Sequence, residues 1–229
     1  KKNLRFKKIK WLQNLDKLKN VPNIFIANEF FDSLPIKQFI LKNNKWHERY
    51  VKITDSNSAE FIDKEFNIKN FEKKINYKIS KNQKFIEYSP MAMKYLSKIN
   101  KIIELYDGGI LIIDYGYLQK KMKNTLQAIS NHRYSNLLNS FGKSDITYHI
   151  NFNLLKETSS KFTKLKTSMT NQREFLINMG IIKRAEIISN NLSFTKKANI
   201  FYRLKRLIDN SQMGKLFKVM FITNKYRKF

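Results

Sequence analysis

The 229-residue sequence contains no cysteine, which excludes disulfide bonds, thiolate catalysis and cysteine–zinc sites together. No apolar run approaches the roughly 18–20 residues that a transmembrane helix needs, so we expect no membrane span. The G-x-S-x-G, P-loop and G-x-G-x-x-G motifs are also absent. The three histidines, His47, His132 and His149, lack the close spacing or carboxylate partner of a metal site, and we therefore predict no metal.

Acidic residues are scarce: the sequence has 18 aspartates and glutamates but 45 lysines and arginines, which gives a formal net charge of +27. This charge raises the hypothesis of an RNA-binding or RNA-methylating α/β domain. The lysines are spread over nearly every segment, however, and accompany many asparagines and isoleucines, which is typical of proteins from AT-rich genomes. We therefore expect nucleic-acid binding to be non-specific.

Apolar runs and helix signals alternate along the chain. Residues 23–27 and 110–116 are predicted strands, and the second is apolar on both faces, as in a sheet that is covered on both sides. Ser89-Pro90 begins a predicted helix between them, since serine caps and proline fits a first turn. The alternating run 216–222 is typical of an edge or antiparallel strand. This order predicts an α/β fold.

We predict a single partial domain over residues 1–229 with two inserted regions. Residues 38–82 contain a β-hairpin around Asn43-Asn44, followed by a polar surface insertion from residue 54. Residues 117–170 are expected to form a loop region on the substrate side. The chain starts without an initiator methionine, which suggests a processed, trimmed or fragmentary chain.

Polar side chains follow both predicted strands. Asn28, Glu29 and Asp32 come directly after the first strand, and Asp114 and Tyr115 end the second. Ligands bind at the carboxyl ends of the strands in open α/β sheets, and adjacent parallel strands would bring these residues together. Capped turns would also use asparagine and aspartate, but they do not require the glutamate. We predict a site for a cationic or amine substrate here.

Six strings of this sequence resemble the MidA-type class I methyltransferases, which include the mitochondrial complex I assembly arginine methyltransferase and its bacterial relatives. They fall in the family's order, cover nearly the whole chain, and are 28–35 (NEFFDSLP), 109–116 (GILIIDYG), 124–132 (NTLQAISNH), 144–152 (SDITYHINF), 172–180 (QREFLINMG) and 213–219 (MGKLFKV). The resemblance implies the C-terminal part of a Rossmann-like class I sheet with an antiparallel last strand. It also implies S-adenosylmethionine-dependent methylation of a protein arginine, on a complex I subunit in the mitochondrial members.

Under this resemblance Glu29 and Asp32 grip the guanidinium, because carboxylates accept its N–H groups in pairs. Asn28 orients the attacking nitrogen or the cofactor, and Phe30 contacts the cofactor. Asp114 and Tyr115 wall the substrate pocket. His132 or His149 relays the released proton.

The chain departs from the family in two ways. The family's glycine-rich cofactor loop lies upstream of the segments that this chain matches. The first helix–strand units therefore come from residues not shown or are lost, and if they are lost we expect the sheet edge at residues 23–27 to be open. Asn124 stands where relatives commonly have aspartate. A catalytically inactive assembly or binding module of the same fold therefore stays open as an alternative. We favour a bacterial cytoplasm, with the mitochondrial matrix as the alternative, and leave the oligomeric state open.

Overall fold

A central sheet carries the predicted site. The computed structural model describes residues 9–55, 58–131, 133–138 and 142–226. The sheet runs in the order β1 (Asn23–Asn28), β6 (Gly108–Tyr117), β12 (Phe217–Asn224) and β11 (Leu165–Asn171), with the short β10 (Ile150–Asn151) beside the end of β6. β1 and β10 run parallel to β6, whereas β12 is antiparallel to both β6 and β11, which confirms the predicted antiparallel last strand.

β1 has β6 as its only strand partner within the described part of the chain, so the edge at residues 23–27 is open there. On one face of this strand Ile24 and Ile26 are 80% and 72% exposed. β6 lies between β1 and β12. Its residues Ile110, Ile112 and Asp114 on one face are buried, whereas Leu111, Ile113 and Tyr115 on the other face are only half-buried, so the predicted covering of both faces is confirmed for one face of the described structure.

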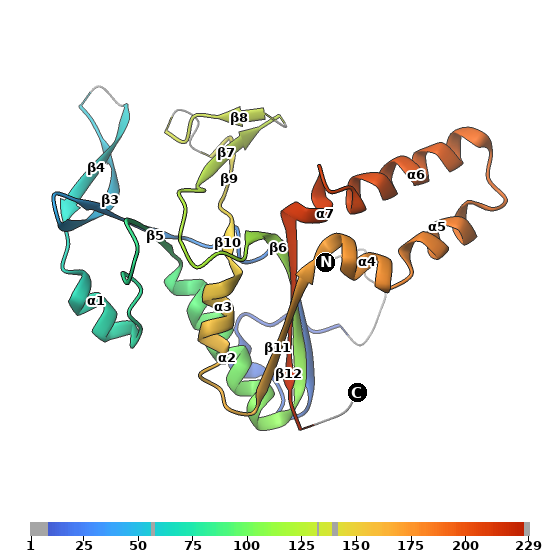
Figure 1. Cartoon of the computed structure of the whole chain (residues 1–229), viewed down its shortest axis with the longest axis horizontal. Helices are drawn as coiled ribbons and strands as arrows, with labels where there is room; N and C mark the ends of the chain where they lie inside the picture. The colour runs from blue at the N-terminus through green and yellow to red at the C-terminus, as the bar shows by residue number, and fades with distance from the viewer. Residues whose placement is uncertain (1–8, 56–57, 132, 139–141, 227–229) are drawn as a thin grey trace.

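Two helices cover one face of the sheet (Figure 1). α2 (Pro90–Tyr106) begins as predicted, because the Ser89 side chain accepts a hydrogen bond of 3.1 Å from the Ala92 amide. α3 (Phe152–Ser159) packs against α2. Their apolar faces and the inner strands form the main core, which includes Leu96, Ile103 and Phe152. This core holds the carboxyl ends of β1 and β6 in place.

The connection from α2 into β6 requires glycine. Gly108 has a φ of +103°, in the left-handed region, and a Cβ at this position would lie 1.9 Å from the carbonyl oxygen of Asn23. Gly108 therefore does more than stop the helix: it allows β6 to begin directly beside β1.

The insertion is a small subdomain with its own sheet and core. Its strands, in the order β4-β3-β2-β5, are β2 (Lys37–Lys42), β3 (Lys45–Ile53), β4 (Ala59–Glu65) and β5 (Phe85–Tyr88), and α1 (Ile68–Ile75) packs with them. The predicted hairpin is confirmed as β2–β3. The predicted surface insertion over residues 54–82 contains regular structure, namely β4 and α1. Exposed lysines and asparagines dilute its apolar pattern, yet Ile68 and Ile79 are buried.

The region predicted as loops, residues 117–170, also contains regular structure. β7 (Gln127–Ser130), β8 (Arg133–Ser135) and β9 (Asp145–Thr147) form a small antiparallel sheet above the central one in Figure 1. These strands are too short to show a clear alternation in the sequence.

The remaining elements are helical: η1 (Leu15–Lys17), α4 (Gln172–Asn178), α5 (Ile181–Ser189), α6 (Phe194–Ile208) and α7 (Met213–Leu216). α5 and α6 project from the sheet as a helical arm at the right of Figure 1. Among the described residues, no helix combines the length and apolarity that crossing a membrane requires.

Candidate functional site

The two polar strand ends lie side by side, as the sequence predicts. β1 and β6 pair in parallel with Asn28 opposite Ile113, and the Glu29 amide donates a hydrogen bond of 3.0 Å to the Ile113 carbonyl. Glu29 has a φ of +47°, which is uncommon for a residue with a long side chain. Strained backbone of this kind gathers at functional sites, and here it leaves the Glu29 side chain exposed at the sheet edge.

Asp114 organises the turn that follows β1. Its side chain is 0% exposed, and its Oδ2 accepts hydrogen bonds from the amides of Phe31 at 3.0 Å and Asp32 at 3.3 Å. The Oδ1 atom accepts a third, from the Tyr115 amide at 2.9 Å. A side chain buried in this way holds the turn in position and offers little surface to a substrate.

Asp32 lies beside Asp114 and is 4% exposed. Burial is the main reason that its pKa rises to about 6, and the negative charges of Glu29 and Asp145 add to the effect. Burial, with Asp32 second, raises the pKa of Asp114 to about 7. The Oδ1 of Asp32 is buried and has no hydrogen-bond partner among the described residues. An acceptor in this state suits a ligand that brings N–H donors.

Tyr115 and His149 form one wall beside these carboxyl groups. Their rings stack at 15° with centroids 6.2 Å apart, and the Tyr115 ring also contacts Phe217 at 4.1 Å. Burial, and then the positive charges of Lys123 and Lys218, lower the pKa of His149, so this ring is neutral at physiological pH.

Asn28 and Phe30 lie at the rim. The Asn28 amide reaches Glu29 Oε1 only at 3.5 Å, so both side chains are largely available. Phe30 is 38% exposed and packs edge-on against Phe31 and Tyr95. His132, the other predicted proton relay, lies outside the described residues.

Sequence reasoning missed Glu87, in β5. This buried carboxylate accepts from the side chain of Gln38 at 2.9 Å, from the Thr125 hydroxyl at 2.6 Å, and from the amides of Thr125 and Leu126 at 2.9 and 3.0 Å. Asn124 belongs to the same hydrogen-bond network, because the Nε2 of Gln38 also donates to the Oδ1 of Asn124 at 3.1 Å. Glu87 therefore ties the insertion to the segment that leads to His149. An isolated glutamate in a short strand carries no sequence signal for this.

The site as a whole is an acidic edge within a strongly basic protein. The negative charges of Glu29 and Asp145 raise the pKa of Asp32, and the charge of Asp32 raises the pKa of Asp114. Within the described ranges, no group of three or more histidine, aspartate or glutamate side chains is arranged to hold a metal ion. The arrangement instead suits an organic cation with several N–H donors, such as a guanidinium.

Comparison with known proteins defines the class. Residues 2–170 match the sequence model of the Methyltransf_28 family, which describes S-adenosyl-L-methionine-dependent methyltransferases. This match covers more than half of the sequence, and the chain belongs to that family. The predicted enzyme class and its cofactor, S-adenosylmethionine, are thus confirmed at the level of the family.

Named relatives agree with this class. The chain is 26% identical over 219 residues to "Protein arginine methyltransferase NDUFAF7, mitochondrial" from Danio rerio, covering 96% of this chain and 51% of that protein. It is 29% identical over 178 residues to the Caenorhabditis elegans homolog of that protein, covering 77% of this chain and 42% of the relative. The chain therefore spans about half the length of the curated relatives it matches.

Solved structures share the fold. Two COG1565 superfamily proteins from Burkholderia thailandensis superpose with TM-scores of 0.77 and 0.75 at 22% and 23% identity. Each covers 93% of this chain, whereas the chain covers 59% and 57% of them, and the second was solved with bound S-adenosyl-homocysteine. The predicted Rossmann-like methyltransferase fold is confirmed.

Proposed function

We propose that this protein takes part in S-adenosylmethionine-dependent N-methylation of an arginine side chain in a protein substrate. The observation that carries the proposal is the buried Asp32 carboxyl group, whose Oδ1 lacks a hydrogen-bond donor among the described residues, beside the exposed Glu29. The relatives named as protein arginine methyltransferases support the same substrate class.

The residues present fit one side of a cofactor site. The acidic edge suits the positive charge of a sulfonium, and the exposed Asn28 and Phe30 would contact the cofactor at the end of β1. When bound, S-adenosylmethionine supplies an electrophilic methyl group. The family's glycine-rich loop does not occur in this sequence, so these residues account for only part of the grip on the cofactor.

Methylation requires the guanidinium to be aligned and to lose a proton. Glu29 and Asp32 accept its N–H groups, which fixes the plane of the guanidinium and directs one nitrogen toward the cofactor side. That nitrogen gains a methyl group and gives up one proton. Asp32, with its raised pKa of about 6, is the nearby acceptor for that proton, and the neutral His149 ring is the second candidate.

Asp114 acts in this proposal as a positioning residue. Since its oxygens are occupied by backbone amides, it fixes the turn that presents Asp32 and does not bind substrate directly. Tyr115 walls the pocket through its stacked contact with His149.

A respiratory complex I subunit is the proposed protein substrate, by the resemblance to the complex I assembly methyltransferase. The curated relatives are named as mitochondrial, which supports the matrix alternative for this chain and gives no support to a bacterial cytoplasm.

Calorimetric titration of the 229-residue chain with S-adenosyl-homocysteine tests the cofactor step, with Glu29→Gln and the exposed Asp16→Asn as matched variants. Transfer of tritium from labelled S-adenosylmethionine to an arginine peptide, followed by acid hydrolysis, tests the reaction. We expect methylarginine, reduced at least about tenfold in Glu29→Gln and unchanged in Asp16→Asn.

The alternatives give different results. Peptide binding without cofactor binding or transfer would identify an inactive binding module. Transfer of label to RNA and not to peptide would overturn the arginine proposal in favour of RNA methylation, provided that the RNA binding survives salt.

A further inference from the structure

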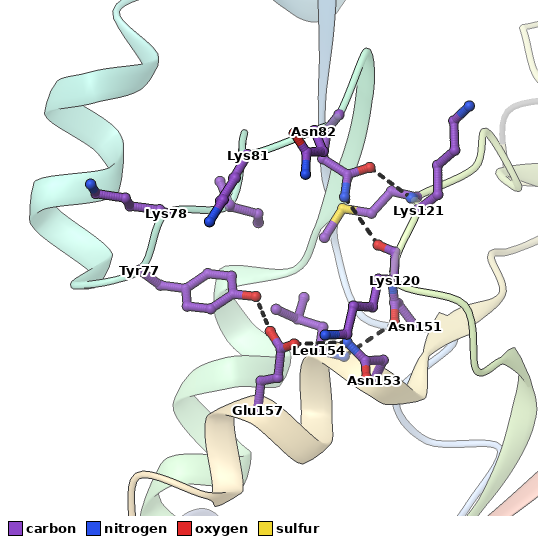
Figure 2. A pocket seen from close by; sticks show the side chains of 13 residues that line it. Tyr77, Lys78, Lys81, Asn82, Lys120, Lys121, Asn151, Asn153, Leu154 and Glu157 are labelled. Carbon is purple, nitrogen blue, oxygen red and sulfur yellow. Dashed lines mark hydrogen bonds between the residues drawn. The ribbon is translucent and has the colours of Figure 1, made fainter.

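A second polar centre lies between the insertion and α3. It is a hollow of about 710 Å³ lined by the loop after α1, the loop after β6 and the first turn of α3 (Figure 2). Four of its lining side chains are lysines: Lys78, Lys81, Lys120 and Lys121. Glu157 is the one carboxylate among its lining residues. The hollow is therefore basic, in contrast to the acidic edge at the ends of β1 and β6.

Glu157 forms no ion pair with these lysines in the described structure. Its carboxylate accepts hydrogen bonds from the Tyr77 hydroxyl and, at 3.0 Å, from the side-chain Nδ2 of Asn153, as the dashed lines in Figure 2 show. In the part of the chain that the structure describes, none of the ion pairs includes any of the four lysines. Four exposed ammonium groups are thus free to meet an anionic ligand.

The walls of the hollow are joined before any ligand binds. Gln83 donates to the Lys120 carbonyl at 3.0 Å and accepts from the Met122 amide at 2.8 Å. These two bonds hold the loop that carries Lys120 and Lys121 against the loop that carries Lys81. Preorganisation of this kind lowers the entropy cost of binding.

The first turn of α3 adds to the positive potential. Asn151 caps this helix by accepting from the Leu154 amide at 3.1 Å, and both residues line the hollow. A helix N-terminus favours negative charge nearby. The helix therefore acts in the same direction as the lysines.

The hollow lies within reach of the acidic edge along β6. Asn151 pairs with Tyr117, three residues beyond Asp114, and three residues of strand span about 10 Å. An extended peptide covers that distance in about three to six residues, counting the turn into the hollow. One polypeptide can therefore occupy both places.

Resting on the proposed function, we propose that this hollow binds an acidic segment of the protein substrate, a few residues from the target arginine. In Figure 2 the ends of Lys78 and Lys121 point outward on different sides. A single phosphate needs donors that converge on one point. Spread ammonium groups suit several carboxylates along a chain, and the amides of Asn82 and Asn153 can bond its backbone.

Fluorescence anisotropy tests this proposal in about 0.15 M salt, where the Debye length of about 8 Å screens the general charge of the protein. The probe is a short labelled peptide with one arginine and a nearby run of glutamates. Two control peptides have the same sequence, except that one replaces the glutamates with glutamine and the other replaces the arginine with citrulline. The variants are Lys81→Gln/Lys120→Gln in the hollow and Lys196→Gln/Lys197→Gln on α6, which change the net charge equally.

We expect the glutamate peptide to bind at least about tenfold more tightly than the glutamine peptide. The hollow variant should lose most of that preference, whereas the α6 variant should keep it. Equal losses in both variants, or no preference for glutamate, would overturn the proposal. So would displacement of the peptide by millimolar inorganic phosphate, since that outcome identifies a phosphate site.

The citrulline peptide separates this proposal from the proposed function. If the hollow binds glutamates, the citrulline peptide keeps the lysine-dependent part of its affinity even if no methyl transfer is ever detected. If transfer occurs at equal rates on the glutamate and glutamine peptides, the methyltransferase proposal stands and the acidic-segment proposal fails.

Discussion

The acidic edge and the lysine-lined hollow differ in the sign of their charged groups and in how deeply these groups are buried. At the edge, Asp32 and Asp114 are almost completely buried, and burial raises the pKa of each toward neutrality. In the hollow, four lysines are exposed and free of ion pairs with described residues. A few carboxyl groups therefore make this edge locally acidic in a protein of net charge +27.

The two regions also differ in whether a substitution there changes the stability of the fold or only the affinity for a ligand. Buried carboxylates influence both the stability of the fold and the affinity for a cation, because their ionised forms are desolvated. Exposed lysines influence the affinity for an anion with little effect on stability. Four variants, taken from the largest expected effect on stability to the smallest, test this contrast.

Asp114→Ala should have the largest effect. The substitution leaves the amides of Phe31, Asp32 and Tyr115 without their acceptor in a buried turn. We expect a loss of about 2–4 kcal/mol in the free energy of unfolding, measured by urea denaturation. Asp16→Ala, at an exposed ion pair with Lys98, should stay within about 0.5 kcal/mol. A similar loss in both variants would contradict the role of Asp114 in the turn.

Glu87→Ala should follow. Glu87 is as buried as Asp32, but its oxygens accept four hydrogen bonds, so its removal strands donors on Gln38, Thr125 and Leu126. We expect a loss of about 2–3 kcal/mol by denaturation and faster amide hydrogen exchange around Thr125 and Leu126. Unchanged exchange in that segment would mean that other contacts hold the insertion to it.

Asp32→Asn should increase the stability of the fold as pH rises, in contrast to the two preceding variants, which decrease it. The folded pKa of Asp32 is about 6, above its unfolded value of 3.8, so the stability that its protonated form gives is complete below about pH 3.8 and is lost as pH rises through 6. Asparagine stays neutral at every pH. The variant should therefore gain about 1–3 kcal/mol relative to wild type between about pH 4 and pH 8.

Thermal denaturation across this pH range measures that gain, and the exposed Asp16→Asn, which should show no such rise, is the matched control. The same Asp32→Asn variant should bind the arginine peptide more weakly, since it removes the negative charge. A flat stability difference over the whole range would contradict the raised pKa.

Lys81→Gln/Lys120→Gln should have the smallest effect on stability. Both side chains are exposed and make no ion pair with described residues, so we expect a change within about 0.5 kcal/mol in urea denaturation. A loss of more than about 1 kcal/mol would show that these lysines support the fold, and the contrast with the acidic edge would fail.

Local sequence patterns predicted the main strands and the main helix of the central sheet. The doubly apolar run at 110–116, the Ser89-Pro90 helix start and the alternating run at 216–222 became β6, α2 and β12. Such patterns work because periodicity and capping depend on neighbours in the chain. The pattern failed over residues 54–82, where exposed lysines and asparagines conceal the few apolar residues of α1 and β4.

For the candidate site, the sequence by itself determined that Asn28, Glu29, Asp32 and Asp114 lie near the carboxyl ends of two strands, and hence that they meet at one edge of a parallel sheet. Only the tertiary structure decided what each carboxyl group experiences there. Asp114 accepts hydrogen bonds from backbone amides, one oxygen of Asp32 has no partner among the described residues, and Glu87 contributes hydrogen bonds from the insertion. Burial and hydrogen bonding depend on residues distant in the chain, such as Phe31 and Asp114 at 83 positions apart, and no local pattern records them.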